Sequence, residues 1–363
     1  MLEQTEPSAE ALDDMLEAIA AEAGIRDAEP VPRFPESAMV ALERAGLTSF
    51  NAVPGEGRPP AAAELDLVRR VARADGSVGR IFDGHLNAIE RLAVQGPAEL
   101  RERELEAFAR GELRGGVWGG DPVPGEGEPA TVIGGRVLRG VKTFCSGAGG
   151  LHRALVIARN EEGGPPLSVW INLLDEQSIE IDETWFRGLG LRASVSHRVV
   201  FHDAPVVAQL SGPGAISAQP WFARDALRTA ASWVGMADAA TNAALSELAV
   251  RPGRGSVEAL AAGRILTAHG TLEAWLTLAA EAMDADSAEL AAISLHGRAA
   301  IYQACRTLLD EAARACGSRP FARAQALDRA RRDLDLFLLQ HRLDPLLARA
   351  GEAALSEFAA AAN

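Results

Sequence analysis

The sequence contains few of the residues that support disulfide frameworks, membrane spans or nucleic-acid binding. Its three cysteines cannot all pair and have no metal-site spacing, so we expect no disulfide framework, no metal and a reducing cytoplasm as the compartment. No apolar run is long enough to cross a bilayer, and the acidic start MLEQTEPSAEALDDM is unlike a secretory signal. The net charge of −14 argues against a general nucleic-acid binder.

Apolar residues are abundant and make up 48% of the 363 positions, which is ample for a substantial core. Amphipathic periodicity predicts five helices in the first part of the chain, with Gly24 as the stop of the first. They span residues 8–24, 36–45, 61–74, 78–94 and 97–110. Seven short β runs follow between residues 115 and 207, which predicts a small antiparallel barrel or sandwich.

The helical period returns near Phe222. Long alanine-rich helices with bundle-like apolar spacing are predicted over residues 224–248, 256–283, 287–316, 322–339 and 343–358. The predicted fold class is therefore α+β, mostly α. We expect a helical domain over 1–112, a β domain over 113–212 and a four-to-five-helix bundle over 213–363.

The chain is organised around the stretch GGRVLRGVKTFCSGAGG, residues 134–150. Gly134 and Gly135 supply a tight hairpin turn, because glycine takes a positive φ without steric cost. The strand after the turn ends in small residues that let a flat ligand approach the backbone, with a ring face from Phe144 and a hydroxyl from Ser146. The alternative is an ordinary hairpin with a glycine-rich exit.

Four segments, in order, resemble the acyl-CoA dehydrogenase superfamily, and specifically its two-component flavin monooxygenases. They are ARADGSVGRIFDGH (72–85), GVKTFCSGA (140–148), WFRGLGLRASVSHRVVFHDAPV (185–206) and RARRDLDLFLLQH (329–341). The resemblance covers nearly the whole chain. It implies a helical domain, a β domain and a helical bundle, and a flavin (FAD or FMN) held between the β domain and the bundle.

The resemblance also implies which residues hold the flavin. Phe144, Ser146 and Gly147 would line the isoalloxazine ring, and Trp118, Gly120 and Asp121 would lie on a neighbouring loop. Family members are commonly homotetramers, so a homo-oligomer, dimer or tetramer, is implied, together with a small-molecule substrate and a separate flavin reductase. A basic cluster that includes Arg329 could face a flavin or CoA phosphate. The alternative is ion pairing with neighbouring aspartates of the same helix.

Candidate catalytic residues follow from the same resemblance. His85, His341 and Ser146 would approach the flavin, where imidazole suits hydrogen-bond donation and proton transfer. The alternative for both histidines is a structural role, with each bonded to a backbone carbonyl. Asp225 occupies a family position for the base that removes an α-proton, although aspartate is one methylene shorter than glutamate. Its alternative is a first-turn carboxylate favoured by the helix dipole.

Three functions remain open from the sequence. A monooxygenase acting on a small organic substrate with reduced flavin and O2 is favoured by KTFCSGA, by the two histidines and by the lack of a family-type glutamate. The second is an FAD-dependent acyl-CoA dehydrogenase with Asp225 as base. The third is an inactive oligomeric scaffold or binding protein, since RPGRGS (251–256) and GGDP (119–122) depart from the family's flavin-binding motifs.

Overall fold

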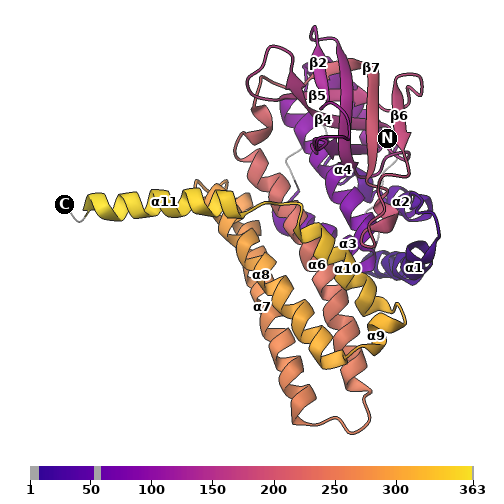
Figure 1. Ribbon diagram of the computed structural model, residues 1–363, viewed down its shortest axis with the longest axis vertical. Coiled ribbons are helices and arrows are strands. Elements are labelled where there is room, and N and C mark those ends of the chain that lie inside the picture. Colours follow the sequence, from indigo (N-terminus) through magenta and orange to yellow (C-terminus); the bar gives the residue numbers. More distant parts are fainter. Residues whose placement is uncertain (1–7, 53–58, 362–363) are drawn as a thin grey trace.

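Five α-helices form the N-terminal part of the chain, in a computed structural model that describes residues 8–52 and 59–361 (Figure 1). The helices are α1 (Ala9–Ala28), α2 (Glu36–Arg44), α3 (Ala61–Ala74), α4 (Gly76–Gln95) and α5 (Ala98–Ala109). Between α3 and α4 the chain breaks at Asp75, whose carboxylate accepts hydrogen bonds from the amides of Ser77 and Val78 at 2.8 and 3.2 Å. This N-cap explains why two helices form where one is possible.

The predicted stop of the first helix at Gly24 is wrong. Helix α1 continues through Gly24 to Ala28. A glycine inside a helix costs only about 1 kcal/mol relative to alanine. The burial of Ile19, Ala23 and Arg26 along one face of α1 offsets that cost.

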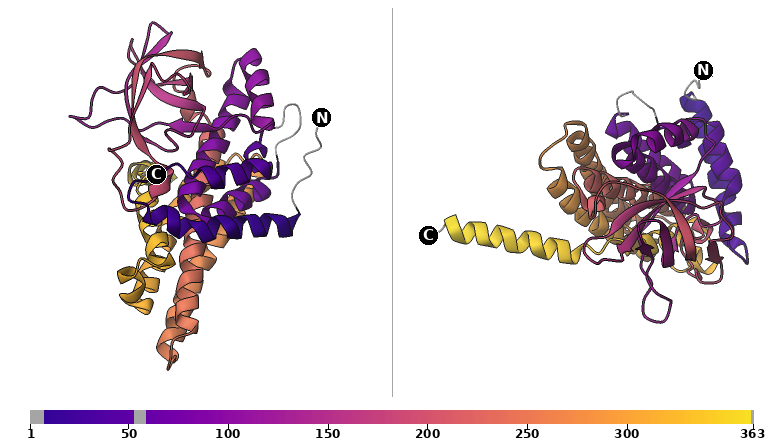
Figure 2. Two further views of the ribbon diagram at one scale, coloured as in Figure 1. Left: turned by 90° about the vertical axis from the view of Figure 1, so that its right-hand side faces the viewer. Right: turned by 90° about the horizontal axis from the view of Figure 1, so that it is seen from above.

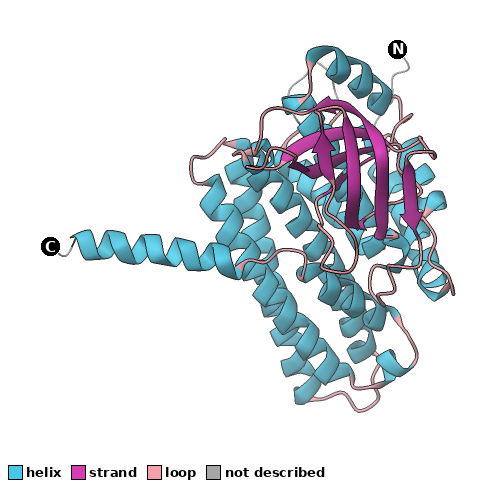
Figure 3. Cartoon of the chain, turned by 45° about the horizontal axis from the view of Figure 1, so that its top comes forward, coloured by secondary structure: helices cyan, strands magenta, loops and turns pink. Residues whose placement is uncertain are grey.

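Seven strands follow, and each predicted β run forms one of them (Figure 3). They are β1 (Gly115–Trp118), β2 (Thr131–Ile133), β3 (Val137–Cys145), β4 (Arg153–Asn160), β5 (Leu167–Asn172), β6 (Ile179–Asp182) and β7 (His197–Gln209). The order β4-β2-β3-β7-β5 closes on itself through the β4–β5 pairing, so five strands form a barrel. The prediction of an antiparallel domain is wrong in part, because β1 and β2 both pair with β4 in parallel.

The predicted hairpin is the β2–β3 connection. Gly134 and Gly135 lie in its turn with φ of 56° and 68°. Only glycine adopts two successive angles of this kind without steric cost. The turn sets the register in which Ile133 faces Val137 and Thr131 faces Arg139.

The C-terminal part is helical again, with α6 (Trp221–Ala249), α7 (Ser256–Asp284), α8 (Leu290–Cys316), α9 (Arg319–Ala322), α10 (Ala326–Leu338) and α11 (Asp344–Ala361). The predicted helix over 322–339 is wrong at its start, since α9 ends at Ala322 and Ala324 takes a φ of +47°. The predicted last helix exists, but it does not join the bundle. Helix α11 projects away from the body and buries none of its residues (Figures 1 and 2).

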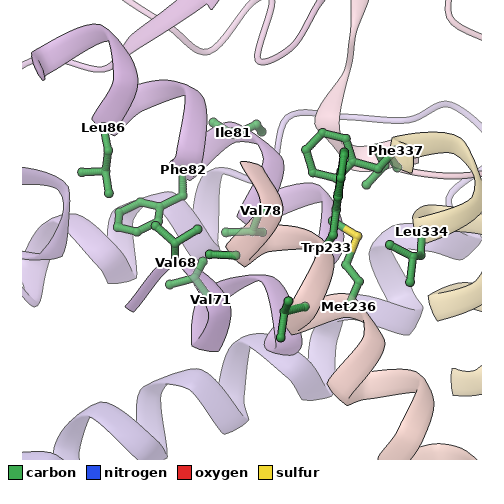
Figure 4. Close-up of a cluster of buried hydrophobic side chains, with 14 of the residues drawn as sticks. Val68, Val71, Val78, Ile81, Phe82, Leu86, Trp233, Met236, Leu334 and Phe337 are labelled. Carbon is green, nitrogen blue, oxygen red and sulfur yellow. The ribbon is translucent and has the colours of Figure 1, made fainter. Parts of the chain in front are cut away.

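One apolar core joins the two helical parts, because α3 and α4 pack against α6 and α10 (Figure 4). Trp233 on α6 and Phe337 on α10 meet edge to face, with ring centroids 6.3 Å apart. Close approach requires Gly235, where an added Cβ would lie 2.1 Å from the carbonyl oxygen of Arg69 on α3. The predicted domain limits at 112 and 212 fall between α5 and β1 and between β7 and α6. The division into three domains stays a prediction.

Candidate functional site

The end of β3 and the turn that follows it, residues 144–147, lie at the rim of the barrel and expose an aromatic ring. Phe144 is 56% exposed, and its ring meets that of Trp185 edge to face at 4.9 Å. Its φ of +54° is costly for a residue with a bulky side chain. Gly147 follows with a φ of +78°. The backbone is thus held in a strained form that turns the Phe144 ring outward. We name residues 144–147 the rim loop.

Buried hydrogen-bonding groups support the rim loop from below. The buried Trp118 donates from Nε1 to the carbonyl oxygen of Ser146 at 3.0 Å. The Ser146 hydroxyl lies 2.9 Å from that of Ser196, which lies 2.7 Å from that of Ser194. The amide of Gly147 donates to the carbonyl of Ser194 at 2.7 Å. Ser146 and Gly147 are therefore fixed, and Trp118 lies beneath the loop instead of lining its outer face.

Gly120 and Asp121 lie beside the end of β3, next to the rim loop. The Thr143 amide donates to the Gly120 carbonyl at 2.9 Å, so the chain after β1 runs along the end of β3. A Cβ at Gly120 would lie 2.5 Å from the Thr143 oxygen, so only glycine fits. Asp121 accepts from the buried Lys142 ammonium at 2.7 Å. Its carboxylate compensates a cation that would otherwise be buried alone.

Helix α10 anchors the segment that carries Ser194 and Ser196. The Asp333 carboxylate on α10 accepts from the Leu191 amide at 2.6 Å. An added Cβ at Gly190 would lie 2.1 Å from the Arg332 carbonyl, so the segment sits directly on the helix. Burial raises the pKa of Asp333 to about 7, and the nearby Asp75 and Asp27 raise it further.

The basic cluster around Arg329 is largely paired within the protein. Arg332 bonds to Asp27 at 2.7 Å and to Asp328 at 2.9 Å, and Arg331 bonds to Asp310 at 3.0 Å. Arg329 lines a cavity of about 10 Å³ together with Asp333. For Arg331 and Arg332, this arrangement favours ion pairing over the binding of a phosphate, whereas the role of Arg329 stays a prediction.

His85 has both ring nitrogens engaged with backbone groups. Its Nε2 lies 2.6 Å from the carbonyl oxygen of Thr48, and its Nδ1 accepts from the Gly115 amide at 3.0 Å. Burial lowers the pKa of His85 to about 4, so the ring is neutral at pH 7. The geometry favours the structural alternative, in which His85 joins α4 to the start of β1.

His341 lies just after α10, next to Trp233 and Arg298. Its Nδ1 lies 3.3 Å from Nη1 of Arg298, and its ring centroid lies 5.3 Å from that of Trp233. Burial lowers the pKa of His341 to about 3, with smaller contributions from the charges of Arg298 and Arg80. His341 is thus a neutral imidazole on the side of α10 that faces α6 and α8.

Asp225 belongs to a network of buried charges between α3, α4 and α6. Its carboxylate lies 2.6 Å from Arg91 and 3.5 Å from Arg228. Arg228 also bonds to Glu64 and Glu90 at 2.8 Å each. Arg224 and Asn87 complete the set, which borders a cavity of about 50 Å³. Burial raises the pKa of Asp225 to about 6, against the opposing effect of Arg91 and Arg228.

A second polar cluster lies on the bundle. Asp238 on α6 and His269 and Glu273 on α7 bring ligand atoms within 4.8 Å of one another. The sequence analysis overlooked the spacing of His269 and Glu273, which are four residues apart on one helical face. Arg69 bonds to Asp238 at 2.6 Å and also to Glu273, so both carboxylates already share a cationic partner. The geometry favours an ion-pair cluster over a metal site.

Known proteins resemble this chain in sequence and in fold. It is 27% identical to the dibenzothiophene monooxygenase of Mycolicibacterium goodii over 156 residues, which cover 39% of this chain and 36% of that protein. The enzyme of the same name from Rhodococcus erythropolis is 27% identical over 150 residues, with the same coverage. The chain therefore aligns with little more than a third of the length of these relatives. No family model matches it.

Solved structures match almost the whole chain. FMN-bound TdsC, a dibenzothiophene monooxygenase from Paenibacillus sp. A11-2, superposes with a TM-score of 0.80 at 18% identity over 95% of this chain and 96% of that one. KijD3, in complex with FMN and a dTDP-linked amino sugar, superposes with a TM-score of 0.79 at 22% identity, over 96% of this chain and 95% of that one. Methanesulfinate monooxygenase MsuC from Pseudomonas fluorescens superposes with a TM-score of 0.78 at 21% identity, over 95% of this chain and 96% of that one.

The chain has an acyl-CoA dehydrogenase-like fold. The resemblance drawn from four sequence segments is therefore confirmed at the level of the fold. Within the acyl-CoA dehydrogenase-like fold, the rim loop lies on the barrel and His341 on the helical bundle. No helix among residues 8–52 and 59–361 is both long and apolar enough to span a membrane.

The sequence analysis missed Arg298, Trp233 and Arg80, which surround His341. A signal for Arg298 exists, because it lies on the buried stripe of α8 with Leu290, Ser294, Ile301 and Cys305. A charged residue on an apolar stripe is unusual enough to single out.

Proposed function

We propose that this protein is a cytoplasmic, homo-oligomeric flavin-dependent monooxygenase. It would use O2 and reduced FMN or FAD, delivered by a separate reductase, to oxidise a small organic substrate. The observation that carries the proposal is the rim loop, with its outward Phe144 ring and fixed Ser146 hydroxyl, in the fold of FMN-bound TdsC and KijD3. The names of the sequence relatives support the same reaction class.

The residues of the rim loop fit a flat ring with polar edges. Phe144 offers an apolar face to such a ring. Bound reduced flavin would supply the electrons for the reduction of O2. The serine chain behind Ser146 holds one hydroxyl in place, so that its hydrogen bond costs little ordering when a ligand binds. Neutral His341 is available as a hydrogen-bonding group on the bundle.

The dehydrogenase alternative receives no support from the geometry of Asp225. Its carboxylate is ion-paired with Arg91 and Arg228, and a base must instead be free to accept a proton from the substrate. Burial raises the pKa of Asp225 to about 6 in spite of these arginines, so the ion pairs and not the pKa argue against its role as a base.

An anaerobic titration with reduced FMN tests the proposal, followed by mixing with O2 while flavin absorbance is recorded. We expect reduced FMN to bind tightly and its reoxidation to be slower than in free solution. Ser146→Ala should weaken binding several-fold, whereas Ser217→Ala, at an exposed serine, should not. Tight binding of oxidised FAD that is bleached by an acyl-CoA would instead establish a dehydrogenase. Absence of flavin binding in both redox states would establish the scaffold alternative.

A further inference from the structure

Arg298 differs from the other buried arginines of the described residues. Those arginines, Arg26, Arg91, Arg114, Arg224 and Arg228, each form an ion pair with a carboxylate. Arg298 is only 4% exposed, and no carboxylate among residues 8–52 and 59–361 pairs with it. Its Nε donates to the carbonyl of Ser294 at 2.9 Å and its Nη1 to His341. A buried cation without a counter-charge is costly, so its retention points to a missing anion.

Two further donors, from Trp233 and His341, belong to the same cluster. The Trp233 Nε1 is buried and has no hydrogen-bond partner among the described residues. Because Nδ1 of neutral His341 accepts from Arg298, its proton is assigned to Nε2, which is then also a donor. Trp233 and His341 are adjacent, with ring centroids 5.3 Å apart. The cluster therefore has donors from three helical regions and no free acceptor.

The nearest further charge, that of Arg80, is also positive. Arg80 lies close enough for its charge to lower the pKa of His341, and it sits over the ring of Phe337 at 5.4 Å. Arg80 is compensated by the buried Asp83 at 2.6 Å, so Arg298 keeps the uncompensated charge. A cation would be repelled here, whereas an anion would meet a desolvated guanidinium and two neutral donors.

We propose that Arg298, His341 and Trp233 form a binding site for an oxyanion, such as a carboxylate, sulfinate or phosphate group. We infer further that this group belongs to the substrate, which makes the substrate a small organic acid and unlike dibenzothiophene, which carries no charge. The identification of the anion as substrate rests on the proposed monooxygenase function. Binding of the anion itself does not, so the two can fail separately.

Helix α10 connects this site to the rim loop. His341 follows the C-terminal end of α10, and Asp333 on the same helix holds the segment with Ser194 and Ser196. Those serines fix Ser146. The oxyanion site and the proposed flavin platform are thus attached to the same helix.

The test uses the full-length protein without flavin, titrated calorimetrically with sodium propionate and sodium sulfate at constant ionic strength. We expect saturable binding to the wild type, weakened at least 10-fold in Arg298→Met. Arg306→Met is the matched control, because Arg306 lies on the same helix but pairs with Asp335 at 2.8 Å. The Arg306→Met variant should bind propionate and sulfate with the same affinity as the wild type. Lack of saturable binding in the wild type, or equal weakening in both variants, would overturn the proposal.

Two additions keep the test decisive. Trp233→Phe removes one donor but keeps an aromatic ring against Phe337, so it should fold and bind three- to tenfold more weakly even if Arg298→Met is unstable. Unchanged binding in a folded Trp233→Phe would count against the site. Competition of propionate with reduced FMN but not with reduced riboflavin would assign the site to the flavin phosphate and overturn the substrate identification. Independent binding of propionate and FMN would support it.

Discussion

At the scale of single residues, the ionisation of Asp333 should control stability near neutral pH. Its pKa in the folded protein is about 7, against an ordinary value near 3.8, so folding favours the protonated form. The stabilisation is complete below pH 3.8 and is lost as the pH rises through 7. We predict that Asp333→Asn, which stays neutral and can still accept from Leu191, gains stability over the wild type by up to about 4 kcal/mol at pH 8.

Urea unfolding of the two proteins between pH 4 and 8 measures this difference. Protonation of His85 and His341 acts in the opposite direction, since their lowered pKa values cost stability as the pH falls below about 6.5. Both histidines are present in both proteins, so their contributions cancel in the difference. A difference that does not change with pH would show that Asp333 stays ionised.

The surroundings of some candidate site residues could be predicted from the sequence and those of others could not, for physical reasons. Phe144 and Ser146 could be predicted because a strand ending in small residues is a local pattern. The role of His85 could not, since its partners Thr48 and Gly115 lie 37 and 30 residues away. The environment of Asp225 depends likewise on Arg91, a contact that only the packing of α4 against α6 creates.

At the scale of elements, the crossing of α3 and α6 depends on one glycine. A Cβ at Gly235 would overlap the Arg69 carbonyl of α3, and a rigid backbone cannot move away from it. We predict that Gly235→Ala lowers the free energy of unfolding by about 3 kcal/mol or more. Gly263→Ala is the matched control within α7, because nothing lies within 4 Å of its Cβ. It should stabilise by up to about 1 kcal/mol through helix propensity.

Thermal and urea unfolding of both glycine variants check this prediction. Equal stability of Gly235→Ala and the wild type would mean that α3 and α6 are further apart than described here. The contrast between the two positions separates packing from propensity, since both are helical glycines replaced by alanine.

Elements were predictable where their cause is local. Short β runs separated by Gly, Pro and Asp located all seven strands, and the separate helices predicted over 61–74 and 78–94 correspond to α3 and α4. Strand partners are not encoded in alternation, so the parallel pairing of β1 and β2 with β4 was missed. The break at Ala324 was missed because alanine usually favours helix.

At the scale of the whole molecule, α11 contributes little to the stability of one chain. It buries none of its residues and extends away from the bundle. We predict that truncation after Leu343 changes the free energy of unfolding by less than about 1 kcal/mol, because only Leu346, Leu347 and Ala350 are partly buried and little apolar surface is newly exposed. Urea unfolding at low protein concentration, with light scattering to record the mass, is the measurement. A loss of more than about 2 kcal/mol would show that α11 is buried in solution.

The buried charge network between α3, α4 and α6 has a consequence for how this protein can change over generations. Removing Asp225, Glu64 or Glu90 alone leaves Arg91, Arg224 and Arg228 with two carboxylates in place of three. One buried positive charge is then uncompensated, at a cost of about 3–5 kcal/mol. Exchange of an acid and its arginine together for apolar residues escapes that cost. Mutational libraries that alter one position at a time should therefore find this region intolerant, while libraries of coupled pairs should find viable sequences. Sequence changes in this network are therefore expected mainly as double replacements, in which an acid and its arginine change together.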